Sequence, residues 1–207
     1  MIIPNFPEDL AQLHHAWHKP EDYPNLPTRK FQIGTDEGGL EFLVFHRNFT
    51  ALVHQWYDKQ PNADPNLLAP SWTAIPTELK VQGLFMRDDK GNLVDVSWND
   101  QHASDAERLI HGKPDMVLGK GDLRTSLVNA GRLGTFIELG LHPFLHNASS
   151  VVYNEPIIAS FHSPQSTWFY KIHGLVQFWW DLWELSNRIK FMPPNIQDIF
   201  NPRVIKH

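Results

Sequence analysis

The sequence contains no cysteine, no long apolar run and no cluster of basic residues. The absence of cysteine excludes disulfide bridges and thiolate metal sites, and it suits a reducing compartment. No apolar stretch reaches the roughly 20 residues that a helix needs to cross a bilayer. The first ten residues, MIIPNFPEDL, lack the basic and apolar regions of a signal peptide. We therefore expect a cytoplasmic protein with no membrane partner.

The balance of charge and the length of the chain indicate a globular domain that does not bind nucleic acid. Lysine and arginine number 18 against 23 acidic residues, which gives a net charge of −5. No basic segment offers a binding surface for phosphates. A chain of 207 residues can bury a substantial core in one domain. We expect a single domain over residues 1–207, with an insertion at about 60–115, and the chain could form a homo-oligomer.

Apolar periodicity predicts four helices, so we expect a mainly α protein built as a four-helix bundle. The predicted helices run from about Pro7 to His18, from Leu40 to Tyr57, from Asp122 to His146 and from Ser166 to Lys190. The Gly38–Gly39 pair is expected to lie before the second helix. The third helix should break or kink near Gly140 and Pro143, because both residues disfavour a helix interior.

Between the second and third predicted helices the sequence changes character. The segment PNADPNLLAPSWTAIP is rich in proline, which predicts a loop. The next segment, LKVQGLFMRDDKGNLVDVSW, alternates apolar and polar residues on both sides of DDKGN, which predicts a small β-hairpin. This hairpin should form part of an insertion that caps the helices. The C-terminal segment, FMPPNIQDIFNPRVIKH, predicts an irregular arm that wraps over the body.

Histidine is abundant, with 12 residues, and two pairs of histidines share one spacing. His14 and His18 in LHHAWH are four residues apart, and so are His142 and His146 in LHPFLH. Residues four apart lie one turn above each other on the same helix face, so each pair could bind one ion. One such pair arises by chance in a chain this rich in histidine, whereas two pairs favour a metal site.

Each pair needs one further donor, and the two remaining helices each supply a histidine. His46 lies on the apolar stripe of its helix with Phe42 and Phe49, so it should point inward. His173 shares a helix face with Gln177 and Trp180. The predicted ligands form two sets of three imidazoles: His14, His18 and His46, and His142, His146 and His173. Inward-facing metal ligands are a known use of the core of a helix bundle.

The type of donor indicates the metal. All-imidazole sites suit zinc, copper, iron or nickel. Catalytic zinc sites commonly include a carboxylate or act singly, whereas two neighbouring three-histidine sites without a carboxylate favour copper. Neutral imidazoles stabilise Cu(I) and leave it able to react with O2. The sequence therefore predicts a dicopper site, with two copper ions as cofactors and O2 as co-substrate.

The histidine motifs resemble those of the type 3 copper proteins, which are the tyrosinases, catechol oxidases, hemocyanins and arthropod phenoloxidases. HHAWH resembles the first copper motif of the hemocyanin and phenoloxidase branch, and GGLEFLVFHRNF is similar to the segment that carries the third ligand of that copper. LHPFLH and SPQSTWFYKIHGLVQFWWDLW resemble the two motifs of the second copper. The likeness covers the copper-binding helices and no more.

The resemblance implies a copper-dependent oxidoreductase that uses O2 to oxidise a small phenolic substrate to a quinone. The implied substrates are ortho-diphenols or ortho-aminophenols, with monophenols as a further option. Pro143 stands where tyrosinases commonly carry an asparagine that helps to deprotonate a phenol, which argues against monophenol hydroxylation. The resemblance leaves an alternative open, a hemocyanin-like protein that binds O2 or copper without catalytic turnover.

Three further residues are candidates near the predicted centre. Glu138 lies one turn before His142, and its carboxylate could orient a ligand or act as a base. His162 precedes the last motif and could contact a ligand or line the way to the metals. We assign Glu138 and His162 to catalysis. His15 replaces His14 as a ligand if the first helix is rotated about its axis.

Overall fold

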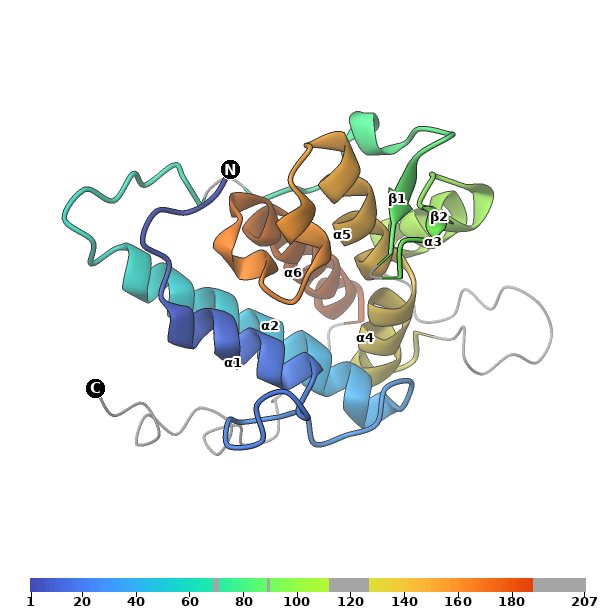
Figure 1. Ribbon diagram of the computed structural model, residues 1–207. Helices are drawn as coiled ribbons and strands as arrows, with labels where there is room; N and C mark the ends of the chain where they lie inside the picture. The colour runs from blue at the N-terminus through green and yellow to red at the C-terminus, as the bar shows by residue number, and fades with distance from the viewer. Residues whose placement is uncertain (69–70, 89, 112–126, 188–207) are drawn as a thin grey trace.

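A computed structural model describes residues 1–68, 71–88, 90–111 and 127–187 of the protein (Figure 1). The helices are α1 (Glu8–His18), α2 (Asp36–Tyr57), α3 (Asp100–His111), α4 (Ala130–Leu139), α5 (Leu141–Val152) and α6 (Thr167–Asn187). A two-stranded antiparallel sheet pairs β1 (Phe85–Arg87) with β2 (Leu93–Asp95). The prediction of a mainly helical fold with a small β-hairpin is confirmed. The predicted C-terminal arm lies outside the described residues.

The helices pack around a shared apolar core. In Figure 1, α1 and α2 run side by side, and the stacked rings of Trp17 and Phe45 join them with centroids 4.3 Å apart. Helix α2 also packs against α4 and α6, and α5 packs against α6. One continuous cluster of buried side chains includes residues from all of these helices. No helix in the described ranges is long and apolar enough to span a membrane.

Helix α2 begins four residues before its predicted start. The hydroxyl of Thr35 accepts a hydrogen bond from the backbone N–H of Gly38 at 3.0 Å, which caps the first turn. The Gly38–Gly39 pair therefore lies inside the helix, and the prediction that it precedes the helix is wrong. Tertiary packing explains the difference, because a side chain at either position would strike a neighbouring backbone.

The backbones of α2 and α4 touch where three glycines meet. A Cβ atom added to Gly134 would lie 1.9 Å from the carbonyl oxygen of Gly39, and one added to Gly131 would lie 2.1 Å from that of Asp36. No side chain tolerates such distances, so this crossing requires glycine. The contact fixes α2, which carries His46, against the helix that leads into α5.

We expect Gly134→Ala to lower the free energy of unfolding by at least about 2 kcal/mol, because overpacking outweighs the gain of about 1 kcal/mol in helix propensity. For a chain of this size, the melting temperature should fall by roughly 4–8 °C in circular dichroism. Ala51→Ser, on an exposed position of α2, should cost less than about 0.5 kcal/mol. An unchanged melting temperature for Gly134→Ala would contradict the close approach.

The predicted third helix is divided at Gly140, as expected. Gly140 has φ −109° and ψ −97°, which ends α4 before α5 begins. Pro143 falls in the first turn of α5, where its missing N–H breaks no helical hydrogen bond. The second half extends past the predicted end at His146 and continues to Val152. The predicted residues 122–126 lie outside the described ranges.

The region between α2 and α4 contains the predicted hairpin and a helix that was not predicted. Met86 pairs with Val94 in the hairpin, and the carboxylate of Asp88 accepts from the N–H of Asn92 at 2.8 Å to close the turn. Helix α3 follows and packs against α5 and α6. Its sequence, DQHASDAERLIH, is mainly polar, but its few apolar residues share one helix face, so a helical pattern was present and was missed.

Candidate metal centre

Helix α1 presents His14 and His18 on one face, next to His46 of α2. The ring centroids of His14 and His18 are 4.7 Å apart, as residues one turn apart on a helix require. Each of these rings lies 5.5 Å from the ring of His46. One ring nitrogen from each of the three residues lies within 4.8 Å of the others. The structure therefore brings the first predicted set together in a geometry that could hold a metal ion.

His15 points away from this set. Its Nε2 lies 2.8 Å from a carboxylate oxygen of Asp22, and its Nδ1 lies 3.3 Å from Nε2 of His162. The rotation of α1 therefore selects His14, and not His15, as the inward residue. His162, which we assigned to catalysis, contacts His15 on this outer side.

The second predicted set also comes together. The ring centroids of His142 and His146 on α5 are 4.6 Å apart, and the ring of His173 on α6 lies 5.2 and 5.3 Å from them. The second group whose ring nitrogens all lie within 4.8 Å of one another differs from the predicted set, because it contains His46, His142 and His173 and lacks His146. His46 stacks on His173 with centroids 4.5 Å apart. His46 thus adjoins both sets, although the sequence placed it only in the first.

Backbone carbonyl groups anchor four of the six imidazoles through Nδ1. The pairs are His14 with Phe161 O at 2.8 Å, His46 with Phe42 O at 2.9 Å, His146 with Ile158 O at 2.6 Å, and His173 with Phe169 O at 2.8 Å. A carbonyl oxygen only accepts, so Nδ1 carries the proton and Nε2 keeps a free lone pair. Hydrogen bonds of this kind orient metal-binding histidines.

Three of these four Nε2 atoms have no hydrogen-bond partner in the part of the chain that the structure describes. Among the described residues, Nε2 of His14, His46 and His146 is buried and makes no hydrogen bond. Leaving a buried acceptor unsatisfied costs roughly 1–3 kcal/mol. Nε2 of His142 faces Nε2 of His173 at 3.2 Å. A metal ion would satisfy these converging lone pairs, so the residues present fit a metal that prefers neutral nitrogen donors.

Burial keeps the six histidines uncharged at neutral pH. Desolvation lowers the pKa of His14 to about 3 and that of His146 to about 4. The same cause, together with the neighbouring imidazoles, holds the pKa of each other member of the cluster well below 6.5. These members are His18, His46, His142 and His173. Neutral imidazoles are the form that binds metal, so no proton has to be displaced at pH 7.

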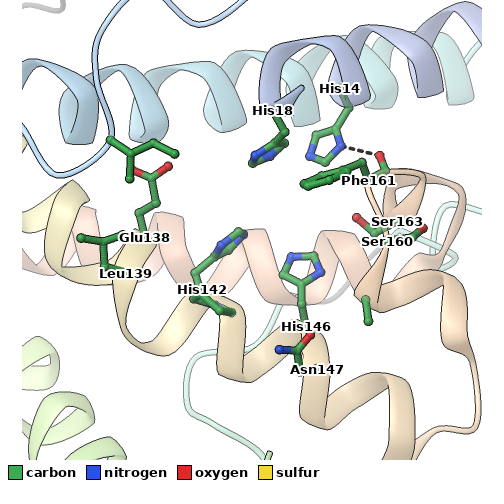
Figure 2. A pocket seen from close by; sticks show the side chains of 13 residues that line it. His14, His18, Glu138, Leu139, His142, His146, Asn147, Ser160, Phe161 and Ser163 are labelled. Atoms are coloured by element: carbon green, nitrogen blue, oxygen red, sulfur yellow. Dashed lines mark hydrogen bonds between the residues drawn. The ribbon is translucent and has the colours of Figure 1, made fainter. Parts of the chain in front are cut away.

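A cavity of about 320 Å³ opens onto the histidines. Figure 2 shows His14 and His18 of α1 on one side of it and His142 and His146 of α5 on the other. The remaining lining residues are Ile33, Glu138, Leu139, Pro143, Asn147, Ala159, Ser160, Phe161 and Ser163. Ligand cavities span about 300–1,000 Å³, so this one suits a small molecule. His162 is absent from the described residues that line it.

Glu138 lies in the cavity wall, and its carboxylate is paired. The two terminal nitrogens of the Arg29 guanidinium donate to it, Nη1 to Oε1 and Nη2 to Oε2, the latter at 2.9 Å. Arg29 also donates to the carbonyl oxygen of Gly38 at 2.8 Å. The pair is buried on both sides, with side-chain exposures of 9% and 8%. In this arrangement Glu138 ties α4 to the segment before α2, and the role of base that we predicted requires release from Arg29.

We expect Glu138→Gln to lower the free energy of unfolding by about 3 kcal/mol, because it leaves the Arg29 guanidinium buried without its counter-charge. Denaturant unfolding followed by tryptophan fluorescence measures this loss. Asp181→Asn is the control, since Asp181 forms an exposed pair with Arg47 worth at most about 1 kcal/mol. Unchanged stability in Glu138→Gln would contradict the structural role of the Arg29–Glu138 pair.

Two residues at the centre were not singled out from the sequence. Arg29 lies in the segment LPTRKF, where no periodicity or motif marks it. Phe161 accepts the hydrogen bond of His14 through its backbone, and its ring stacks on His18 with centroids 5.2 Å apart. The sequence analysis selected the neighbouring residue, His162, because it is a histidine. The contacts of both loop residues depend on the tertiary fold and could not be predicted from the sequence.

Comparisons with protein-family models, with curated proteins and with solved structures find no match to the chain. The fold and the site define a mainly helical protein with a buried centre of six histidines. The likeness to type 3 copper proteins stays a prediction based on sequence motifs.

Proposed function

We propose that this protein is a binuclear copper oxidase that uses O2 to oxidise ortho-diphenols or ortho-aminophenols to quinones. One observation carries the proposal: six uncharged imidazoles from four helices meet beside a small cavity, and the buried Nε2 atoms of three of them lack partners. In this proposal α1, α2, α5 and α6 form a four-helix bundle around a dicopper site of the type 3 kind.

Each copper ion would be held by one of the two histidine sets. His14, His18 and His46 would hold one ion, and His142, His146 and His173 the other. The contact between His46 and His173 makes the two sites neighbours. When bound, copper supplies the redox chemistry that couples the oxidation of two diphenol molecules to the reduction of one O2 to two water molecules.

The protein contributes orientation and a dry environment. Hydrogen bonds from Nδ1 hold four imidazole rings in place, so little reorganisation is needed when an ion binds. The rings of Phe49 and Phe169 pack against His14 at 5.3 and 5.1 Å, and Phe42 packs against His46 at 4.5 Å. These aromatic walls shield the side of the centre that faces the core from water.

The polar groups of the cavity favour diphenols over monophenols. Pro143 lines the cavity and offers no side-chain donor or acceptor. The Glu138 carboxylate, which also lines the cavity and could take a proton from a phenol, is paired with Arg29. Hydroxylation of a monophenol requires removal of its one hydroxyl proton and insertion of a new oxygen into the ring, whereas oxidation of a diphenol releases two protons and two electrons and inserts no oxygen.

A second function is favoured by the position of Phe161. Its ring lines the cavity and stacks on His18, where it would hinder a phenol that approaches this histidine. A hemocyanin-like protein that binds O2 or copper without turnover would use such a ring to keep substrates out.

Reconstitution with copper under air tests the proposal. We expect two copper ions per chain by elemental analysis, and O2 uptake with catechol but not with a monophenol. Bound copper with no catechol oxidation would support the carrier function. A protein that retains zinc and does not bind copper would overturn both the oxidase and the carrier function.

A further inference from the structure

The mouth of the cavity is apolar and exposed to solvent. Ile33 and Leu139 both line the cavity, and they remain 55% and 58% exposed. Phe31, in the same segment as Ile33, is 47% exposed. Figure 2 shows Leu139 beside Glu138, at the side of the cavity near His142. Apolar side chains that gather at a site and stay exposed mark a surface that binds an apolar group.

The backbone that carries these residues is held in place. Glu41 of α2 accepts hydrogen bonds from the N–H groups of Lys30 and Phe31 at 2.8 and 2.9 Å. A Cβ atom placed on Gly34 would lie 4.0 Å from Cδ1 of Leu139, so this segment lies against the end of α4. The apolar mouth therefore exists before any ligand arrives, which reduces the entropy lost on binding.

The cavity has no free counter-charge for a charged substituent. Among the described lining residues, Glu138 is the one acidic side chain, and Arg29 already neutralises it. Lysine and arginine are absent from that lining. A carboxylate or ammonium group that packs against this apolar mouth would lose part of its hydration without gaining a partner, which disfavours a charged substituent.

We propose that Ile33 and Leu139 form an apolar subsite for the substituent of the phenolic ring, so that the substrates are catechols with an uncharged alkyl or aryl substituent, and not phenolic amino acids. This inference rests on the proposed function for the position of the catechol ring. The small cavity receives the ring, and the exposed subsite at its mouth receives the substituent.

A homologous series of catechols tests the subsite in the copper-loaded protein. KM should fall from catechol to 4-methylcatechol to 4-butylcatechol, by up to about fourfold for each methylene group that becomes fully buried. Dihydroxyphenylalanine, which carries both charges of an amino acid, should show a KM at least about tenfold above that of 4-butylcatechol. A KM that is lowest for the amino acid would overturn the proposal.

Substitutions at the mouth of the cavity test whether Ile33 and Leu139 cause the dependence of KM on the alkyl substituent. Leu139→Ser and Ile33→Ser should each raise the KM for 4-butylcatechol relative to that for catechol by about fivefold or more. The matched control is Leu185→Ser, because Leu185 is 76% exposed at the far end of α6 and does not line the cavity. It should leave the ratio of the two KM values unchanged. An unchanged ratio in both mouth variants would overturn the assignment.

Binding to the zinc-loaded protein separates this inference from the proposed function. Zinc does not change its redox state, so calorimetry can measure the dissociation constants of the same catechols without turnover. If the copper-loaded protein oxidises no catechol, the proposed function fails. The measurements on the zinc-loaded protein then still test whether the apolar subsite binds the substituent. Affinity that rises with alkyl length and is lost in Leu139→Ser supports the subsite, and affinity independent of alkyl length contradicts it.

Discussion

Replacing His46 with alanine is expected to reduce the copper content from two ions per chain to at most one and to abolish catechol oxidation. His46 is the ring that adjoins both histidine sets, at 5.5 Å from His14 and 4.5 Å from His173. Its loss removes a ligand from the first set and the stacking partner of His173 in the second. Loss of even an outer hydrogen-bond partner weakens a metal site 10–100-fold, so loss of a ligand should weaken it at least as much.

The control lies on the same helix. His54 is two turns beyond His46, and its ring contacts Tyr170 at 5.9 Å, away from the cluster. His54→Ala should keep both copper ions and the oxidation rate. Copper bound by His46→Ala with the stoichiometry and affinity of the parent protein would contradict the assignment of His46.

The metal-free protein is expected to unfold as the pH falls from about 6.5 to about 4. The pKa of His14 is about 3 and that of His146 about 4 in the folded protein, compared with about 6.5 in an unfolded chain. Between these values the unfolded chain binds more protons, so acid favours unfolding. At pH 4 each of these two residues alone should cost about 3 kcal/mol, and the total stability of a typical domain is only about 5–15 kcal/mol.

Denaturant unfolding at a series of pH values measures this loss. His146→Gln should reduce the slope of unfolding free energy against pH by up to about 1.4 kcal/mol per pH unit, whereas Asn147→Ala, the next residue on α5, removes no titrating group and should keep the parent slope. Bound metal should move the acid transition to lower pH, because metal and protons compete for the same nitrogens. A metal-free protein equally stable at pH 7 and pH 4 would contradict the burial of neutral histidines.

Much of the fold followed from the apolar periodicity of the sequence. The end of α1 at His18 and the end of α2 at Tyr57 were predicted, and so was the turn of the hairpin at DDKGN. The errors arose where tertiary contacts overrode local preference. The Gly38–Gly39 pair disfavours a helix by intrinsic propensity, yet it lies inside α2, where the backbone of Gln32 packs against Gly38 and the backbone of α4 packs against Gly39.

The histidine centre was predictable because helical spacing fixes which residues share a face. Two pairs four residues apart and two inward histidines sufficed to predict that six imidazole rings would lie in contact. The position of His46 between both sets could not be predicted, because it depends on how α2 and α6 pack. The salt bridge between Glu138 and Arg29 joins residues that are 109 positions apart in the sequence. No local sequence pattern indicates such a pair.

The central claim is that six imidazoles hold two neighbouring copper ions. Anomalous diffraction at the copper absorption edge, from crystals of the copper-loaded protein, tests it most directly. The account predicts two peaks, one bound by His14, His18 and His46 and the other by His142, His146 and His173. A single peak, or copper bound elsewhere while these six rings stay unliganded, would contradict it.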